Sequence, residues 1–552
     1  MGGDLCGSQK GSVGIGWRQF AIAISLLALG ACSSAEDEDK RGTVGFVQGF
    51  LGGVAVDEPQ AALVGRDILS AGGTAADAAV AMYFTMAVTL PSQAGLGGGG
   101  VCLAYDHKTG KTEMLDFLAR APHAAASRAD RPNAIPMNAR GFFALYSKYG
   151  RLRWGQLIAP AENVARFGVQ VSRAFASDMA RVGNALIADP ESRRVFGRKE
   201  GSGPIVEGDF MTQVDLAATL ARVRVQGPGD LYTGAMARQL VEAVGRAGGA
   251  LTQKDLRDAI PVWRGTIQVP FGNLTAHFPL SPPPAGVLAA QMFAMLANDD
   301  MYGDGDAATR VHALSETAMR AYADRATWWK PTNVGPVDFD GFVAEARIEQ
   351  LLAGYSASKH TPAASLASKP VSYPENPSAT GFVALDRNGS AVSCAVTMNN
   401  VFGTGRIAPG TGILLAALPG QKGRGATALS PMLVVNENVN EFFLAAASSG
   451  GVTAPTSLMN VVAGTLLGEL PLEEAIIAPR VHHGGQPDTT YYEKNLDPSL
   501  VKALAAKGHT LAATKALGRV NAVYCSNGAQ PHPETCVVKT DPRGFGLAAS
   551  AD

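Results

Sequence analysis

Three small residues at the start of an expected strand, Ser378, Ala379 and Thr380, raise the question of a hydroxyl nucleophile. They stand in "ENPSATGFVALDRNGSAVSCAVTMNN", which reads as a turn-rich lead-in, a strand, a tight turn and a second strand. Thr397 and Asn399 end the second strand two residues apart, so their side chains share one face. A hydroxyl is a weak nucleophile until a base lies beside it. The segment therefore offers two hydroxyls, one on each side of an alanine.

The elements around this segment alternate between strands and helices. Strands are expected at residues 381–386, 391–398, 431–436 and 442–447. Helical spacing of apolar residues dominates from about 140 to 365, and the alanine-rich stretch "TAADAAVAMYFTMAVTLPS" predicts a buried helix. Strand-rich segments with helical segments on both sides indicate stacked sheets covered by helices, which is an α+β fold.

Composition excludes some classes of function. The 552 residues are 46% hydrophobic and 17% charged, and the formal net charge is −1. Nucleic-acid backbones are bound by clustered basic surfaces, so we expect no nucleic-acid partner. The length is sufficient for a large core and more than one lobe.

The N-terminus has the pattern of an export signal. Arg18 precedes the apolar run "FAIAISLLALGAC", which ends at Cys32 and is short for a bilayer span. Its last residues resemble a bacterial lipobox, which predicts a signal peptide over residues 1–31 and lipidation of Cys32; an ordinary signal peptide is the alternative. Residues 32–45 then form a polar tether. Because Ser33 follows the cysteine in place of an acidic residue, we expect a periplasm-facing lipoprotein of the bacterial envelope, held in the outer membrane by its lipid.

Four further cysteines would lie in an oxidising compartment. Cys525 and Cys536 bracket a short loop between two expected strands, which favours a local disulfide. Cys102 and Cys394 stand in apolar strand-like stretches and are expected to be buried. No cysteine spacing matches a zinc site.

Two other motifs do not indicate a ligand. The run "GLGGGG" at residues 95–100 lacks the Lys-Ser/Thr of a phosphate-binding loop, and we interpret it as a turn that allows close backbone packing. His482 and His483 are adjacent, so their rings would lie on opposite sides of a strand, and a structural role is favoured over metal binding. No metal and no cofactor is expected.

Several motifs in a fixed order identify a family. They are "ILSAGGTAADAAVA", "GLGGGG", "GRLRWGQLIAPA", "HALSETAMRAYADR", "FGTGRIAPGTGILL", "LSPMLVV", "SSGG" and "APRVHH". With them the chain, from about Val54 to its C-terminus, resembles the gamma-glutamyltransferases (gamma-glutamyltranspeptidases), which are N-terminal nucleophile hydrolases.

The resemblance implies a four-layer αββα sandwich made as one precursor that cuts itself once. The cut would follow the proline-rich linker at 361–378 and give a heterodimer of a large subunit (46–378) and a small subunit (379–552), the boundary depending on the site of cleavage. The new N-terminal residue would supply both the hydroxyl and the amine that acts as its base, because a free α-amine titrates near neutrality.

The nucleophile position departs from the family pattern. When the chain is anchored on Asp386, Gly389, Thr397 and Asn399, the family's threonine nucleophile falls on Ala379. Thr380 could act after a cut between Ala379 and Thr380, Ser378 could act after a cut behind Pro377, or the site could be inactive. Either hydroxyl would need a one-residue slip or bulge near the strand start. Because Pro377 restricts the peptide before Ser378, the sequence favours Thr380.

The supporting residues match the family better. Thr397 and Asn399 match the residues that hold the nucleophile and contact the substrate. Gly450 and Gly451 match the paired glycines whose N–H groups form the oxyanion hole, which contributes much of the catalysis of amide cleavage.

The substrate-binding residues match less well. Leu118 stands where the family has the arginine that binds the substrate α-carboxylate, and Arg120 is a displaced clamp or a surface residue. The family's acidic residue for the α-amine falls on Gln421, and its adjacent serine pair falls on Thr427 and Ala428. An amide replaces a charged partner poorly. The resemblance thus implies a hydrolase or acyltransferase for γ-glutamyl or a related acyl group on a small-molecule or peptide amide. The alternative is an inactive family member that binds a peptide or envelope ligand.

Overall fold

The computed structural model describes most of the chain from residue 49 onward. The described residues are 49–123, 129–280, 284–329, 340–366, 378–419, 428–530 and 532–551. The expected signal peptide and tether, including Cys32, lie outside these residues, as do Gln421, Thr427 and residues 367–377 of the expected linker. Within the described residues, no helix combines the length and the apolar character that a bilayer span requires.

Seven antiparallel strands form the first sheet. In spatial order they are β20 (Leu547–Ala551), β1 (Gly52–Val56), β9 (Ala379–Asp386), β10 (Ala391–Thr397), β2 (Gly99–Asp106), β3 (Lys111–Phe117) and β6 (Val262–Arg264). The two strands expected around the candidate nucleophile, β9 and β10, are therefore neighbours at the centre of this sheet.

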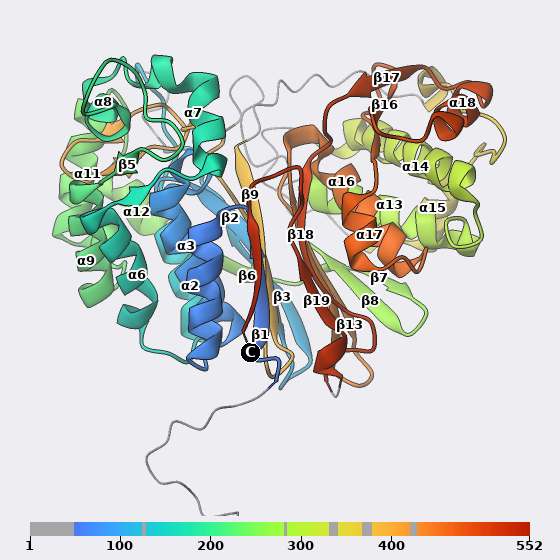
Figure 1. Cartoon of the computed structure of the whole chain (residues 1–552), viewed down its shortest axis with the longest axis horizontal. Coiled ribbons are helices and arrows are strands. Elements are labelled where there is room, and N and C mark those ends of the chain that lie inside the picture. Colours follow the sequence, from blue (N-terminus) through green and yellow to red (C-terminus); the bar gives the residue numbers. More distant parts are fainter. Residues whose placement is uncertain are drawn as a thin grey trace, which may run out of the picture. The chain divides into compact units, whose positions relative to one another are not determined.

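Six antiparallel strands form the second sheet. Their order is β19 (Cys536–Lys539), β18 (Arg519–Cys525), β14 (Glu441–Ser449), β13 (Ser430–Asn436), β8 (Leu274–Phe278) and β7 (Ile267–Phe271). Side chains from both sheets share one buried apolar cluster, which includes Val383 of β9 together with Leu433 and Ala445 of the second sheet. The two sheets therefore pack face to face, as Figure 1 shows.

Helices cover the outer face of each sheet. The first sheet carries α2 (Pro59–Ser70), α3 (Ala75–Thr89) and α5 (Asn138–Tyr149), with α6 (Trp154–Phe167) and α9 (Val214–Gln226) outside them; the second carries α13 (Pro284–Ala297), α14 (Ala307–Trp328) and α16 (Ala454–Leu466). The predicted four-layer αββα sandwich is thus confirmed.

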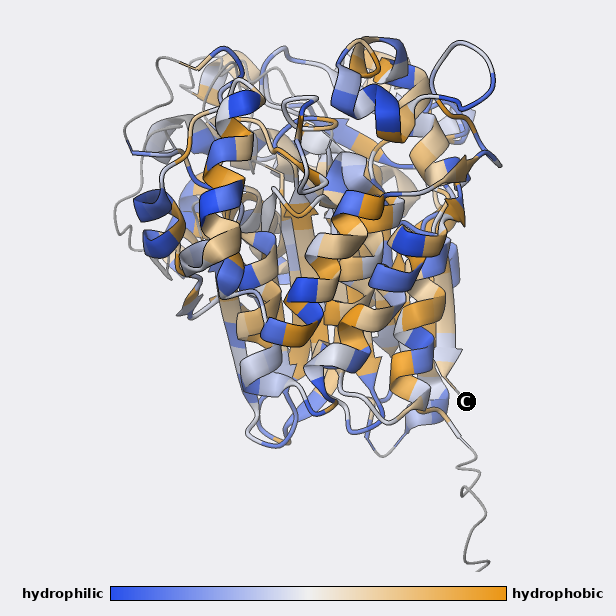
Figure 2. Ribbon diagram, turned by 90° about the vertical axis from the view of Figure 1, so that its left-hand side faces the viewer, coloured by the Kyte–Doolittle hydropathy of each residue, from blue (hydrophilic) through white to orange (hydrophobic). Residues whose placement is uncertain are grey.

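Helix α3 shows how the sequence determines this packing. Thr74 caps its start in a reciprocal pair with Asp77, and all 15 of its residues are buried. A helix that is apolar on every side must be covered on every side. Figure 2 shows this helical layer from outside, with hydrophilic and hydrophobic residues intermixed along the helices that face the viewer. The prediction of a buried helix at α3 is confirmed.

Shorter elements complete the described chain. The helices are α4 (Pro91–Ala94), α7 (Arg173–Leu186), α8 (Pro190–Phe196), α10 (Asp230–Thr233), α11 (Ala235–Arg246), α12 (Gln253–Asp258), α15 (Glu345–Leu352), α17 (Leu472–Ile477) and α18 (Pro498–Ala506). The strands are β4 (Val169–Gln170), β5 (Phe210–Met211), β11 (Ile407–Ala408), β12 (Ile413–Leu414), β15 (Val481–His483), β16 (Thr490–Glu493) and β17 (Leu511–Thr514), and the 3₁₀ turns are Asn298–Asp300, Asp340–Phe342, Ala363–Leu366, Gly451–Thr453 and Pro533–Thr535.

Two disulfides cross-link neighbouring strands. Cys525 of β18 is bonded to Cys536 of β19, which confirms the local disulfide. Cys102 and Cys394 are buried as expected, but they are also bonded, because β2 and β10 place them directly opposite each other. This second bridge joins positions 292 residues apart and connects the expected large-subunit region to the expected small-subunit region.

His360 links the segment of chain before β9 to Glu316 and Asp488. Its Nδ1 lies 2.6 Å from Glu316 of α14, and its Nε2 lies 2.9 Å from Asp488, beyond β15. Burial works to lower the pKa of His360, but the hydrogen bonds to the two carboxylates outweigh it and the pKa is raised. Because carboxylates accept both bonds, the ring is a charged imidazolium that links the two regions of the chain.

The other titratable groups around His360 are neutral or already paired near neutral pH. The pKa of His509 is about 3 and that of His483 about 4, mainly because burial disfavours their charged forms. Burial also lowers the pKa of His312. Glu316 has a pKa of about 2, since hydrogen bonds such as that from His360 outweigh its burial, and Arg320 lies 3.4 Å from it.

We predict that His360→Gln lowers the free energy of unfolding by about 2 kcal/mol at pH 6, because charged hydrogen bonds of this kind contribute roughly that much. A raised pKa in the folded state means that the contribution is complete below the unfolded pKa and is lost as pH rises through the folded pKa. Urea unfolding at pH 6 and pH 9 should therefore show a smaller difference at pH 9. His532→Gln, at an exposed histidine, is the control. A difference that grew with pH would contradict the assignment.

Candidate active site

The ends of three strands meet where the candidate residues lie. Ala379 at the start of β9 pairs with Thr397 at the end of β10, so the segments around both residues are adjacent. Across the gap between the sheets, a Cβ added to Gly381 would lie 2.9 Å from the Cβ of Ala447 in β14. The end of β14, which leads to Gly450, therefore lies against the start of β9.

Ser378 is the hydroxyl that Thr397 contacts. The Oγ of Ser378 lies 3.1 Å from the Oγ1 of Thr397, and both residues are buried. Thr397 Oγ1 also accepts a hydrogen bond of 2.9 Å from the N–H of Asn399. Asn399 has a φ of +60° and donates from its side chain to the carbonyl of Ala417. The structure thus brings Ser378, Thr397 and Asn399 into one hydrogen-bonded group.

Thr380 belongs to a different set of contacts. Its Oγ1 donates to Asp57 Oδ2 over 3.0 Å, and its side chain is fully buried. The pairing of β9 with β10 is continuous from Ala379 to Leu385, without the slip or bulge that would shift Thr380 to the position of its neighbour. Ala379 itself is buried in the apolar cluster between the sheets.

Gly450 and Gly451 form a turn directly after β14, here called the glycine turn. Their φ values of +132° and +68° lie where side chains are disfavoured. A Cβ on Gly450 would also lie 2.5 Å from the Cα of Gly518. Among the residues that the structure describes, no acceptor receives a hydrogen bond from either N–H, so both donors are available to an oxyanion.

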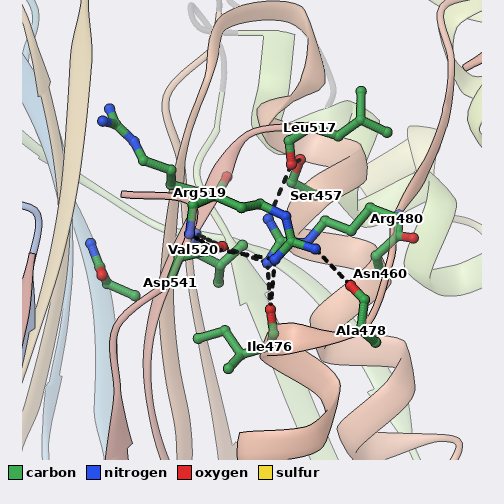
Figure 3. Close-up of polar contacts among 12 residues, drawn as sticks. Ser457, Asn460, Ile476, Ala478, Arg480, Leu517, Arg519, Val520 and Asp541 are labelled. Atoms are coloured by element: carbon green, nitrogen blue, oxygen red, sulfur yellow. Dashed lines mark hydrogen bonds and ion pairs between the residues drawn. The ribbon is translucent and has the colours of Figure 1, made fainter. Parts of the chain in front are cut away.

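A buried charged cluster fixes the loop that backs the glycine turn. Arg480 donates to the carbonyl of Leu517 over 3.1 Å and pairs with Asp541, whose Oδ2 also accepts from the N–H of Val520. Ser457 donates to the same carbonyl of Leu517 over 2.9 Å. Figure 3 shows these contacts converging on the loop just before β18. Gly518 is therefore held rigidly against Gly450.

The predicted substrate residues are less complete. Arg120 lies 3.7 Å from Asp116, which also lies 3.5 Å from Arg264, so Arg120 already has a carboxylate partner. Leu118 is buried in the cluster that contains Ala379. The other two predicted substrate residues, Gln421 and Thr427, lie outside the described residues.

The glycine-rich run at residues 95–100 packs closely against neighbouring backbone, as the sequence indicates. A Cβ at Gly97 would lie 2.2 Å from the carbonyl oxygen of Leu414, and one at Gly99 would lie 2.1 Å from the N of Ala119. Only glycine permits this backbone approach beside β2. The interpretation as a close-packing turn is confirmed.

The histidine pair lies away from this site, on β15. The Nδ1 of His482 bonds to the hydroxyl of Thr456, and the Nε2 of His483 bonds to Asp488. The two groups of ligating side chains in the described residues are His312 with Glu316 and His509, and His360 with His483 and Asp488. In the second group the N–H of Gly485 donates to His483 Nδ1, so His483 Nε2 carries a proton and has no lone pair for a metal.

Sequence reasoning missed the polar residues that surround Thr380. Asp57 follows β1, Ser449 ends β14, and Arg519 and Asn521 both lie in β18. They meet through hydrogen bonds and an ion pair at this end of the sheets. Polar residues at strand ends are the only local signal, and that signal does not identify partners hundreds of residues away.

Known proteins place these observations in a family. The sequence model described as gamma-glutamyltranspeptidase matches residues 61–418 and 416–551. The chain is 29% identical to the glutathione hydrolase proenzyme of Escherichia coli (strain K12), covering 91% of this chain and 94% of that protein. It is 28% identical to the acylase ACY 1 proenzyme of Pseudomonas sp. (strain V22), covering 86% and 90%.

Solved structures agree on the fold. Cephalosporin acylase from Bacillus halodurans superposes with a TM-score of 0.77 at 23% identity, covering 94% of this chain and 98% of that chain. The gamma-glutamyltranspeptidase of Helicobacter pylori is 27% identical, with a TM-score of 0.52, and covers 57% of this chain and 93% of that chain.

We predict that Thr397→Val lowers the free energy of unfolding by about 1–3 kcal/mol, since the buried N–H of Asn399 loses its acceptor. Denaturant unfolding of the purified protein measures the change. Thr465→Val is the matched control, because the buried hydroxyl of Thr465 has no partner within the described structure and its loss should be close to neutral. Equal effects of the two substitutions would contradict the role given to Thr397.

Proposed function

Because this chain belongs to the gamma-glutamyltranspeptidase family, we propose that it is a self-processed amide hydrolase and acyltransferase with Ser378 as its nucleophile. The observation that carries the proposal is the 3.1 Å contact between Ser378 Oγ and Thr397 Oγ1. Thr397 matches the family residue that holds the nucleophile, and Ser378 is the hydroxyl it contacts. This choice departs from the preference for Thr380, whose hydroxyl is bonded to Asp57.

Self-cleavage would occur between Pro377 and Ser378. The Oγ of Ser378 attacks the carbonyl carbon of Pro377, the C–N bond breaks, and the hydroxyl proton ends on the departing amine. Water then hydrolyses the ester, which leaves a carboxylate on Pro377 and a free hydroxyl and amine on Ser378. The new amine is the base that the hydroxyl otherwise lacks.

The processed site would then act on an amide. The amine of Ser378 takes the hydroxyl proton while the oxygen attacks the substrate carbonyl, and the N–H groups of Gly450 and Gly451 bind the developing oxyanion. The leaving amine takes the proton, and an acyl ester remains on Ser378. Water or an amine acceptor then removes the acyl group, giving hydrolysis or transfer.

The acyl group is γ-glutamyl or a related acyl group. Relatives are named both glutathione hydrolase and acylase, so the family accommodates more than one acyl group. Leu118 replaces the arginine that the family uses for the α-carboxylate, and Arg120 already pairs with Asp116. These residues favour a related acyl group over γ-glutamyl itself.

A second candidate function follows from Ala379. The usual nucleophile position has no hydroxyl, and an inactive family member would bind a peptide or envelope ligand at the same site. The availability of both glycine N–H groups favours the enzyme.

The sequence pattern at the N-terminus supports an envelope lipoprotein. The apolar run that ends at Cys32 predicts export and lipidation, and the polar tether would separate the enzyme from an outer membrane. The two disulfides within the described fold accord with an oxidising compartment.

We predict that the purified protein separates into two fragments after reduction, the smaller one beginning at Ser378. Without reduction, the two fragments should remain one covalently linked species, because the disulfide between Cys102 and Cys394 joins them. Ser378→Ala should slow cleavage at least 100-fold, since it removes the attacking oxygen, whereas Thr380→Val should still yield the Ser378 N-terminus. N-terminal sequencing and intact mass measure both results. A fragment that begins at Thr380, or an uncut wild-type chain, contradicts the proposal.

We predict that Cys32→Ser releases the protein from the membrane fraction, because the thiol that receives the lipid is absent. Detergent partitioning and the mass of the N-terminal peptide are the measurements. Cys6→Ser is the control, since Cys6 lies within the expected signal peptide at residues 1–31. An unmodified N-terminal peptide in the wild type would rule out lipidation.

A further inference from the structure

Asp57 is a buried carboxylate that connects the two sheets beside the candidate active site. In the first sheet it follows β1 and accepts a hydrogen bond of 3.0 Å from Thr380 of β9. From the second sheet it accepts bonds of 3.3 Å from Ser449 of β14 and 3.0 Å from Asn521 of β18. Its side chain is 3% exposed, so these donors replace the water it has lost.

Arg519 is the cation that pairs with Asp57. Its Nη2 lies 3.5 Å from Asp57 Oδ2, and its Nε donates to Ser449 Oγ over 3.2 Å. Its Nη2 also reaches the amide oxygen of Gln93 in α4, at 3.3 Å. Figure 3 shows the Arg519 guanidinium extending away from Arg480. The group formed by Asp57, Ser449, Arg519 and Asn521 is here called the inter-sheet bridge.

The bridge acts directly on the glycine turn. Ser449 is the residue before Gly450, and Arg519 is the residue after Gly518, which packs against Gly450. Both neighbours of the turn are therefore tied to Asp57, one through a hydroxyl and the other through a guanidinium.

Positioning matters here because the reacting groups come from different sheets. Ser378 leads into β9 of the first sheet, and the glycine turn ends β14 of the second. Most of the remaining contact between the sheets is apolar, with side chains such as Val383, Leu433 and Ala445. Apolar contacts have no preferred direction, whereas hydrogen bonds and ion pairs fix both distance and angle.

Stability alone does not account for the bridge. Removing two charges from water costs about as much as their attraction returns, so apolar residues of similar size would stabilise the fold equally well or better. We therefore interpret this ion pair as a contact that fixes the distance and angle between the two sheets.

We propose that Asp57 and Arg519 are positioning residues that set the separation between the nucleophile strand and the glycine turn. This proposal rests on the proposed function, in which Ser378 attacks a carbonyl whose oxygen enters that turn. Neither residue touches the reacting atoms; both act through Ser449 and the turn. The expected consequence of their loss is a defect in kcat rather than in KM, because a misplaced oxyanion hole weakens binding of the transition state more than that of the substrate.

The test compares Asp57→Asn and Arg519→Met with a matched control. Asp324→Asn removes a carboxylate that is 5% exposed and paired with Arg347 in the helical layer over the second sheet, where no reacting group lies. With the faster of γ-glutamyl- and glutaryl-p-nitroanilide as probe, kcat should fall about 100-fold in both bridge variants, while KM changes less than threefold. The control should keep the wild-type kcat. Amide hydrogen exchange at residues 449–451 should be about tenfold faster in the bridge variants only.

The two readouts separate the possible failures. Exchange that is no faster in the bridge variants than in Asp324→Asn overturns the positioning role, as does a fall in kcat no larger than that of the control. If wild-type protein cleaves neither probe, the proposed function loses support, and hydrogen exchange alone decides whether the bridge orders the turn. Arg519 is 24% exposed, so Arg519→Met provides a folded variant even if Asp57→Asn does not fold.

Discussion

The pairing of β9 with β10 is the interaction on which the candidate site depends. It places Thr397 opposite Ala379 and thereby brings Ser378 within hydrogen-bond distance of the Thr397 hydroxyl. Because neighbouring side chains on a strand point to opposite faces, a register shift of one residue would turn Ser378 and Thr380 together away from their partners and present Ala379 in their place. The disulfide between Cys102 and Cys394 fastens β10 to β2, its neighbour on the side away from β9.

Sequence reasoning recovered what local pattern and motif order encode. It predicted the layered fold, the buried helix α3, the strands β9 and β10 and the disulfide between Cys525 and Cys536, whose partners are 11 residues apart. It did not predict the bond between Cys102 and Cys394, because that bond depends on which strands become neighbours. The inter-sheet bridge was not predicted for the same reason. Asp57 and its partners are hundreds of residues apart, and no local sequence pattern identifies them as neighbours.

The choice between Ser378 and Thr380 shows a second limit of prediction from sequence. Both residues flank Ala379, both are small, and the restriction imposed by Pro377 pointed to Thr380. What separates them in the structure is the partner of each hydroxyl, Thr397 for one and Asp57 for the other. That difference follows from an unbulged register, which is a property of the folded sheet rather than of the residues themselves.

The Cys102–Cys394 bridge also changes how a processed enzyme would respond to dilution. Two subunits held only by non-covalent contacts separate by mass action when their concentration falls below the dissociation constant. A disulfide between the regions on either side of the cut makes reassociation intramolecular, so assembly no longer depends on how much protein is present. At low protein concentration, a cleaved molecule would therefore remain a single unit.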